Sequence, residues 1–248
     1  AGIPFIAMPT TSGTGSEVTC WATIWDMEHK QKYSLESKFM YAKAAFIVPE
    51  LTISLPECLT YYTAMDALSH AFEAWWSIYS NEISDRYAEE AITLILENLQ
   101  GIKKDKGNIR ARENLALASL MAGLAFSNTK TTIVHSVSYP MTSYFNVNHG
   151  LACSLTLLEF LKYNESYIDD NKKKRLLKKL SLADMNALIE RINEIRNYIG
   201  IPKTLHEAGI DEKGIDIILK SAFHPERAKN NPREVSEGEL KKILRRIL

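Results

Sequence analysis

"TAMDALSHAFEAWWS", residues 63–77, is the stretch that decides the fold. Its apolar residues recur at intervals of three and four, which places them on one face of an α-helix. They are Met65, Leu68, Ala71, Phe72 and Trp75. Further segments with helical periodicity follow this stretch, and short β-compatible runs come before it. We therefore expect a mainly α protein, with a few strands in residues 1–55 and an all-helical domain in residues 56–248.

The β-compatible runs are short and end at turns or prolines. They are "IPFIAMP" (3–9), "VTCWATIWD" (18–26) and "KAAFIVP" (43–49). The second is rich in β-branched and aromatic residues, which favours a strand. A strand of this kind near a sheet edge can pair with a second copy of the chain or be covered within the same chain. We predict a homodimer.

The later segments read as helices with recognisable ends. We expect them at 84–100, 112–128, 149–164, 181–200 and 236–248. Ser84 and Asn148 are predicted N-caps, and Gly200 is the predicted residue after a helix end. Ser236 and Glu239 form a predicted capping box. The sequence therefore predicts at least seven helices.

Composition excludes several classes of function. The 248 residues are 46% apolar and 24% charged, and 30 basic residues balance 30 acidic ones. No global charge points to nucleic acid or a membrane surface, and no apolar run approaches the roughly 18 residues of a membrane helix. Three scattered cysteines favour a reduced cytoplasmic location. The charge block at 169–182 reads as a solvated helix face, with a nucleic-acid patch as the alternative.

Two histidine-containing stretches suggest a metal site. Asp66 and His70 are four residues apart and so share one helix face. His135 and His149 flank a stretch with Pro140, which we expect to be a helix–loop–helix connection. One carboxylate and three imidazoles suit Fe²⁺ or Zn²⁺, and no thiolate is evident that would indicate structural zinc. Spacing alone leaves open an aspartate paired with a satisfied core histidine.

A second candidate site is "MPTTSGTGSEVT", residues 8–19. A strand that runs into a turn rich in hydroxyls and glycines can offer donors to phosphate oxygens. The stretch matches neither the dinucleotide fingerprint nor the P-loop. A tight turn between strands is the alternative.

Three stretches, in the same order and at similar spacing, closely resemble the iron-containing (group III) alcohol dehydrogenase family. They are "PTTSGTGSEVT" (9–19), "MDALSHAFEAWWS" (65–77) and "VHSVSYPMTSYFNVNHGLACSL" (134–155). The resemblance extends over effectively the whole chain. It implies a dehydroquinate synthase-like fold and reduction of aldehydes or oxidation of alcohols with NAD or NADP. The dinucleotide would lie between an α/β domain, whose last strands are residues 1–55, and the helical metal-binding domain.

The resemblance also implies roles for particular residues. Asp66, His70, His135 and His149 would bind Fe²⁺ or Zn²⁺. The cofactor side would comprise Thr10, Thr11, Ser12, Gly13, Thr14 and Lys32. The ion would polarise the oxygen of a small alcohol or aldehyde substrate while hydride passes between carbon and nicotinamide. Because ligating histidines are neutral, activity should fall in acid.

Departures from the family pattern sharpen these expectations. Tyr139 replaces a histidine that many members carry and that is discussed as a proton relay. With an ordinary pKa near 10, tyrosine is a poorer shuttle at neutral pH. We expect Tyr139 to act as a catalytic-site residue that faces the substrate space above the metal and tunes the site without binding the ion. Thr132 stands where many members have glycine, and Val48 where they have aspartate.

The stretch "SNTKTTIVHSVSYPMT" (127–142) is most similar to the subgroup of phosphonoacetaldehyde reductases and sugar-acid oxidases. Substrates of that subgroup are anionic. Arg227, Lys229 and Arg233 are basic residues that could meet an anion, although surface charges are more often simply solvated.

Two alternatives remain open at this stage. Family members carry a long region before the "PTTSGTGSE" stretch, with a GGGS-type turn for the pyrophosphate, and this chain lacks it. The chain is therefore either part of a longer dehydrogenase or a truncated, non-catalytic metal-binding or interaction module. A lyase or a glycerol-type dehydrogenase on the same fold is a further rival. Asp66 in place of glutamate, and the retained His135, argue against the dehydroquinate synthase pattern.

Overall fold

A computed structural model describes residues 2–223 and 225–248, and the protein is mainly α as predicted. Its helices are α1 Glu57–Trp76, α2 Glu82–Lys104, α3 Ile109–Thr129, α4 Ile133–Phe145, α5 His149–Asn164, α6 Asp170–Leu180, α7 Met185–Ile199, α8 Glu212–Ser221, α9 Pro225–Ala228 and α10 Glu237–Arg246. The strands are β1 Ile6–Ala7, β2 Trp21–Asp26, β3 Gln31–Glu36 and β4 Ala44–Ala45. Short 3₁₀ turns are η1 Ser16–Val18, η2 Lys38–Met40, η3 Pro49–Thr52 and η4 Glu165–Tyr167.

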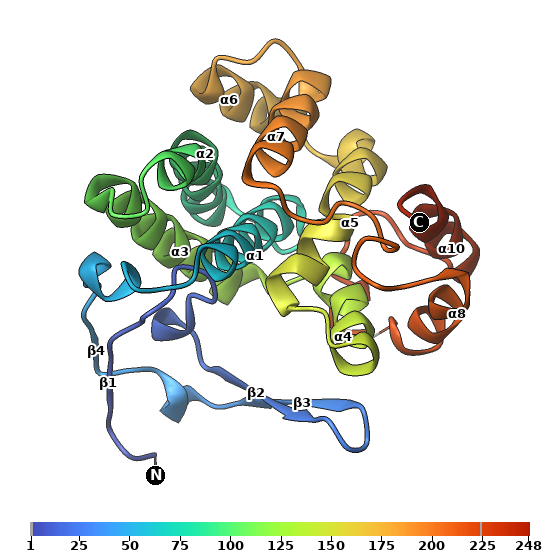
Figure 1. The fold of residues 1–248 in the computed structure, drawn as a ribbon, viewed down its shortest axis with the longest axis horizontal. Helices are drawn as coiled ribbons and strands as arrows, with labels where there is room; N and C mark the ends of the chain where they lie inside the picture. The colour runs from blue at the N-terminus through green and yellow to red at the C-terminus, as the bar shows by residue number, and fades with distance from the viewer. Residues whose placement is uncertain (1, 224) are drawn as a thin grey trace.

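Helix α1 runs through the centre of the helical part and packs against α2, α3 and α5 (Figure 1). Every residue from Ala64 to Ser77 is buried, so the helix is covered on all sides and not on a single face. Each large apolar side chain buried there stabilises the fold by about 1.5–3 kcal/mol. A polar residue in this segment must therefore find a partner inside the protein.

Most of the predicted helix ends are confirmed. Asn148 caps α5 by accepting from the Gly150 amide, Gly200 follows α7 with φ 74°, and Ser236 with Glu239 forms the capping box of α10. The N-cap predicted at Ser84 is wrong. Asn81 caps α2 and accepts from the Ser84 amide at 3.1 Å, while the Ser84 hydroxyl accepts from the Asn81 amide at 2.9 Å. The capping box therefore starts one turn earlier.

The predicted helix–loop–helix connection between His135 and His149 is also wrong in its details. Helix α4 runs through Pro140 and ends at Phe145, and the capping residue Asn146 has a left-handed backbone with φ 55°. Proline lacks the amide that would bond to the preceding turn and costs about 3 kcal/mol in a helix interior. The segment is buried almost throughout, so packing outweighs this cost. His135 consequently lies in the first turn of a buried helix.

The charge block at 169–182 forms α6, and two of its basic residues form ion pairs with acidic residues of α2. Lys172 Nζ lies 2.9 Å from Asp85 Oδ1, and Arg175 Nη2 lies 2.8 Å from Glu89 Oε1, both on α2. These pairs favour the interpretation of a helix face over a nucleic-acid patch.

The strands form two small sheets beside the helices (Figure 1). β1 pairs with β4 in parallel, and β2 pairs with β3 as an antiparallel hairpin. One edge of β2 is thus paired with β3, and the homodimer stays a prediction. Among the described residues, no helix is long and apolar enough to cross a membrane.

Candidate metal centre

Three of the predicted metal ligands come from three different helices and meet at one carboxylate oxygen. Asp66 Oδ1 on α1 lies 3.4 Å from His135 Nε2 on α4 and 3.7 Å from His149 Nε2 on α5. In a tetrahedral zinc site, neighbouring ligand atoms lie about 3.3–3.6 Å apart. The side chains therefore stand at nearly the separation that a shared ion requires.

The same side chains carry polar atoms without partners. Among the described residues, eight buried side-chain nitrogen or oxygen atoms have no hydrogen bond, and three of them gather here. These three are Asp66 Oδ1, His70 Nδ1 and His135 Nε2. An unsatisfied buried polar atom costs about 1–3 kcal/mol, and native proteins contain few of them. The cluster fits a bound divalent ion, which would satisfy all three at once.

The far nitrogens of the two closest histidines are held by other residues. Glu73 contacts His135 Nδ1, and Ser138 Oγ lies 3.4 Å from His149 Nδ1. Both partners can accept a hydrogen bond from Nδ1–H, so each Nε2 would be free to bind an ion placed beside Asp66. Partners of this kind fix the tautomer of metal-binding histidines.

Glu73 also belongs to this centre, and the sequence did not predict it. It is fully buried on α1 and accepts hydrogen bonds from the backbone amides of Thr132, Val134 and His135 at 2.9, 2.8 and 3.3 Å. It thereby satisfies buried amides at the start of α4 that have no partner within the helix. Burial alone would raise the pKa of Glu73, but His135 and Thr132 lower it below its ordinary value.

Thr132, which stands where many family members have glycine, belongs to this network. Its hydroxyl donates to Glu73 Oε1 at 2.6 Å and accepts from Trp76 Nε1 at 2.9 Å. The threonine thus links α1 to the first turn of α4 and helps to fix His135.

His70 lies beside the cluster, and its nitrogen is farther from Asp66 Oδ1 than those of His135 and His149. Its Nδ1 is 4.0 Å from Asp66 Oδ1, and its ring is stacked between Phe126 and His135 with centroids 4.2 Å from each. Burial lowers the pKa of His70 to about 3, against the opposing effect of Asp66. The imidazole is therefore neutral at physiological pH, which is the form that binds a metal. Its role as a ligand stays a prediction.

Cys153 joins the cluster and was not predicted as a site residue. One potential ligand atom from each of Asp66, His135, His149 and Cys153 lies within 4.8 Å of the others. Cys153 follows His149 by four residues on α5, so both project from the same face of that helix. This spacing is the signal in the sequence that could have identified it.

Gly150 allows α5 to approach α1 closely enough for His149 to reach Asp66. A Cβ atom at residue 150 would lie 2.0 Å from the backbone oxygen of Tyr62 and 3.2 Å from the Asp66 Cβ. No side chain fits in this space. The glycine therefore sets the distance between the two helices at the metal centre.

We expect the substitution Gly150→Ala to push the first turn of α5 away from α1. The overpacking should lower the free energy of unfolding by about 1–3 kcal/mol. It should also weaken metal binding, because His149 moves away from Asp66. Denaturant unfolding and metal titration measure both effects. Gly238→Ala is the control, because no atom lies within 4 Å of a Cβ at that position. Unchanged metal affinity in Gly150→Ala would contradict this role.

The cluster forms one wall of a cavity of about 790 Å³. The β2–β3 hairpin forms the facing wall, because alternate residues of both strands point the same way. The side chains facing the cavity come from three directly opposed pairs, Trp21 with Glu36, Thr23 with Ser34 and Trp25 with Lys32. Ligand cavities usually measure about 300–1,000 Å³. The volume of the cavity lies within this range.

Comparison with known proteins identifies the family of the chain that carries this centre. A profile of iron-containing alcohol dehydrogenases matches residues 1–49, and one of the Fe-containing alcohol dehydrogenase family, C-terminal, matches residues 60–248. The chain belongs to the iron-containing alcohol dehydrogenase family. The family that the sequence motifs indicated is therefore confirmed.

Individual members of the iron-containing alcohol dehydrogenase family are similar along nearly the whole chain. The NADPH-dependent butanol dehydrogenase of Clostridium saccharobutylicum is 34% identical over 249 residues, which cover 96% of this chain and 63% of that enzyme. For the 1,3-propanediol dehydrogenase of Klebsiella pneumoniae the identity is 33%, with 98% and 64% covered. This chain thus spans somewhat less than two thirds of these relatives.

The fold of the family is shared as well. The crystal structure of sulfoacetaldehyde reductase from Bifidobacterium kashiwanohense in complex with NAD⁺ matches with a TM-score of 0.92 and 33% identity. The match covers 99% of this chain and 65% of that one. Butanol, propanediol and sulfoacetaldehyde enzymes are all similar to this chain, so the predicted subgroup stays a prediction.

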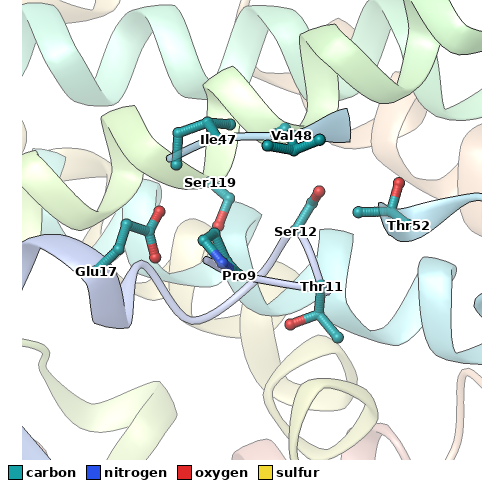
Figure 2. Close-up of a pocket in the computed structure, with 9 residues that line it drawn as sticks. Pro9, Thr11, Ser12, Glu17, Ile47, Val48, Thr52 and Ser119 are labelled. Carbon is teal, nitrogen blue, oxygen red and sulfur yellow. The ribbon is translucent and has the colours of Figure 1, made fainter. Parts of the chain in front are cut away.

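The residues expected on the cofactor side of this dehydrogenase-family chain fall into two groups. Thr14 and Lys32 line the large cavity. Thr11 and Ser12 instead line a recess of about 10 Å³, and Thr10 is exposed. Figure 2 shows this recess, with Val48 on the opposite side and Ser119 of α3 beside it. A recess of that size holds at most a water molecule.

Two glycines press the family's hydroxyl-rich loop onto the helices. A Cβ at Gly13 would lie 2.7 Å from the Thr63 Cβ, and one at Gly15 would lie 2.5 Å from the Gly123 Cα. Gly15 also has φ 56°, a left-handed conformation that favours glycine. The loop is therefore held directly against α1 and α3, with Thr14 at the rim of the cavity.

Tyr139, the residue that replaces the histidine of many family members, lies in the cavity wall next to the cluster. Its ring is stacked on that of His149 with centroids 6.0 Å apart, and Lys32 Nζ lies 3.6 Å from its centroid. Burial raises the pKa of Tyr139, so its hydroxyl is protonated at neutral pH. Its predicted role as a tuning residue that does not bind the ion remains to be tested.

Proposed function

We propose that this chain is the metal-binding part of a metal-dependent NAD(P) alcohol dehydrogenase or aldehyde reductase. One observation carries the proposal: unpaired atoms of Asp66, His135 and His70 converge in the wall of a cavity large enough for a nicotinamide and a small substrate. Family membership and the NAD(P)-dependent relatives support it. The alternative, a non-catalytic metal-binding or interaction module, predicts that no dehydrogenase activity accompanies the bound metal.

The residues of this chain have distinct tasks in the proposed reaction. Asp66, His135 and His149, with His70 or Cys153, would hold Fe²⁺ or Zn²⁺. The ion would supply a Lewis acid that polarises the substrate oxygen. Glu73 keeps the proton of His135 on Nδ1, and the β2–β3 hairpin covers the cavity and limits the access of water. Thr14 and Lys32 are placed to contact the nicotinamide side.

Two cations in the cavity support an anionic substrate. Lys32 and Arg227 both approach the ring of Tyr139, with Lys32 Nζ 3.6 Å and Arg227 Cζ 5.3 Å from its centroid. Among the side chains that the structure describes, no carboxylate forms an ion pair with either cation. Burial, and then the charge of Arg227, lower the pKa of Lys32 to about 7. A substrate anion would offset the repulsion between them.

The other basic residues singled out in the sequence lie elsewhere. Arg233 packs on Tyr163 and pairs with Glu239 at 3.3 Å, and Lys229 is exposed and outside the cavity lining. We therefore propose a short aldehyde that carries a sulfonate, phosphonate or carboxylate group. The similarity to a sulfoacetaldehyde reductase supports this substrate class.

We expect Arg227→Gln to lower kcat/KM for an anionic aldehyde roughly 10- to 100-fold relative to a neutral aldehyde of the same length. This factor corresponds to the loss of one charge-assisted hydrogen bond of about 1.5–3 kcal/mol. Lys229→Gln, two residues away and exposed, is the matched control and should leave the ratio unchanged. A ratio that is the same in Arg227→Gln and wild type would exclude Arg227 from the substrate site.

The proposed function is tested with full-length protein purified anaerobically and loaded with Fe²⁺ or Zn²⁺. The measurement is aldehyde-dependent oxidation of NADH or NADPH with a panel of neutral, sulfonate, phosphonate and sugar-acid aldehydes. Turnover that requires the metal supports the dehydrogenase. Stoichiometric metal without turnover on any substrate would favour the non-catalytic module. The homodimer and the cytoplasmic location remain predictions.

A further inference from the structure

Lys130 has a backbone conformation that residues other than glycine rarely adopt. It caps the end of α3 with φ 59° and ψ 170°. Such a conformation is strained for a residue with a Cβ atom and persists only where surrounding contacts enforce it. The carbonyl of Thr129, just before it, accepts from the Ser77 hydroxyl at 3.0 Å. The carbonyl of Thr131, just after it, accepts from the Asn230 side-chain amide at 3.0 Å. Strain that is held in place in this way indicates a functional role.

Lys130 lies in the wall of the large cavity, together with Thr131 and Arg227. The guanidinium of Arg227 donates to the Thr131 hydroxyl, and Thr131 is only 2% exposed. This bond fixes Arg227 against the connection between α3 and α4, where Lys130 lies one residue earlier. Two basic side chains therefore share one part of the cavity wall.

The cavity carries an excess of basic side chains. Of the lining residues that the structure describes, Lys32, Lys130 and Arg227 are basic, whereas Asp66 and Glu36 are acidic. Asp66 belongs to the metal centre, which leaves one carboxylate for three basic residues. Glu36 Oε2 lies 3.6 Å from Lys130 Nζ, and both side chains are about half exposed. An exposed ion pair of this kind contributes little to stability, so an anion that enters the cavity can replace Glu36 at Lys130.

The position of Arg227 favours an anionic group of the substrate over a phosphate of the dinucleotide. Its Cζ lies 5.3 Å from the centroid of the Tyr139 ring, which is stacked on His149 of the metal centre. A short substrate whose oxygen binds the ion would extend over Tyr139 and reach Arg227 with its other end. The phosphates of a dinucleotide are separated from the nicotinamide by a ribose, so they lie farther from the ion.

We propose that Lys130 and Thr131 complete, with Arg227, the subsite that binds the anionic group of the substrate. Lys130 contacts the anion directly, and Thr131 positions the guanidinium of Arg227. The strained conformation is retained because it holds the Lys130 side chain at the cavity. This inference rests on the proposed function and adds to it two residues that determine the preference for anionic over neutral aldehydes.

Binding of an unreactive anion tests the subsite without turnover. Metal-loaded full-length protein is titrated calorimetrically with ethanesulfonate and with its neutral counterpart, ethyl methyl sulfone. We expect Lys130→Gln and Thr131→Val each to weaken ethanesulfonate binding roughly tenfold, the effect of losing one charge-assisted hydrogen bond, and to leave sulfone binding unchanged. Lys130→Arg keeps the charge and Thr131→Ser keeps the hydroxyl, so both should bind ethanesulfonate like wild type. Lys229→Gln, exposed and outside the cavity lining, is the control.

The same variants distinguish the two possible anions. The affinities for NADH and NADPH should be unchanged in Lys130→Gln and Thr131→Val. Weaker binding of the dinucleotides, with ethanesulfonate binding unaffected, would assign the subsite to a cofactor phosphate and overturn the proposal. Equal ethanesulfonate affinity in wild type and Lys130→Gln would also overturn it.

Lys130→Gly separates the strain from the charge. Glycine adopts this conformation freely, so the Tm of the full-length protein should rise by about 2–4 °C although the ion pair with Glu36 is lost. Ethanesulfonate binding should fall roughly tenfold, as in Lys130→Gln. A lower Tm in Lys130→Gly would contradict the strain and the functional reason given for it.

Failure of the subsite and failure of the proposed function give different results. Ethanesulfonate binding that depends on Lys130, in a protein without aldehyde turnover, contradicts only the dehydrogenase. Turnover with the same ratio of kcat/KM for anionic and neutral aldehydes in wild type and Lys130→Gln contradicts only the subsite.

Discussion

Asp66→Asn protein should fail to retain a divalent ion under conditions in which wild type binds one per chain. Asp66 Oδ1 is the atom that the other ligands share, at 3.4 Å from His135 Nε2, 3.7 Å from His149 Nε2 and 4.0 Å from His70 Nδ1. Burial alone would raise the pKa of Asp66, but His70, His149 and His135 lower it well below its ordinary value. The Asp66 carboxylate is therefore ionised at any physiological pH.

An asparagine keeps the shape of the side chain and removes this charge. The loss in metal affinity should exceed the roughly 10- to 100-fold that removal of an outer partner usually costs. Equilibrium dialysis with elemental analysis measures it. Asp26→Asn is the matched control, because Asp26 pairs with His29 at 2.8 Å on the exposed hairpin turn. Wild-type affinity in Asp66→Asn would remove Asp66 from the ligand set.

Glu73→Gln should weaken metal binding roughly 10- to 100-fold although Glu73 is not itself placed as a ligand. The expected cause is the tautomer of His135. A glutamine amide that donates to Nδ1 would shift the imidazole proton to Nε2, the atom that faces Asp66. His135 would then present a hydrogen to the ion in place of a lone pair.

Glu73→Ala should have a second effect, on stability. It leaves the first turn of α4 and the imidazole of His135 without their buried acceptor, which should lower the free energy of unfolding of the metal-free protein by about 3–5 kcal/mol. Glu82→Gln on the exposed face of α2 is the control. If Glu73→Gln binds metal as tightly as wild type, Glu73 does not orient His135.

The sequence predicted the parts of the site that depend on helix periodicity. Asp66 and His70 were identifiable because a carboxylate and an imidazole share a face of an otherwise apolar helix. Glu73 lies on that same face, three residues after His70, but the spacing does not distinguish it from other charged residues of the chain. Its role depends on the amides of α4, which are remote in sequence, so spacing within α1 gave no reason to expect it.

At Pro140 and Cys153 the tertiary structure outweighs the local pattern. A proline indicates a loop, but a fully packed segment can hold a proline within a helix. Cys153 is one of three thiols that are scattered in the sequence, and its relation to His149 matters only if α5 starts at His149. Only the first strand of the hairpin was predicted, within residues 18–26, and β3 was not. The position of the hairpin over the cavity follows from long-range packing that no local pattern encodes.

The most direct measurement is a metal titration of metal-free, full-length protein, in which aldehyde-dependent NAD(P)H oxidation and bound metal are followed together under anaerobic conditions. The account predicts that activity rises with added Zn²⁺ or Fe²⁺ and saturates at one equivalent per chain, and that Asp66→Asn stays inactive throughout. Activity that is already complete without metal, or binding that saturates normally in Asp66→Asn, would contradict it.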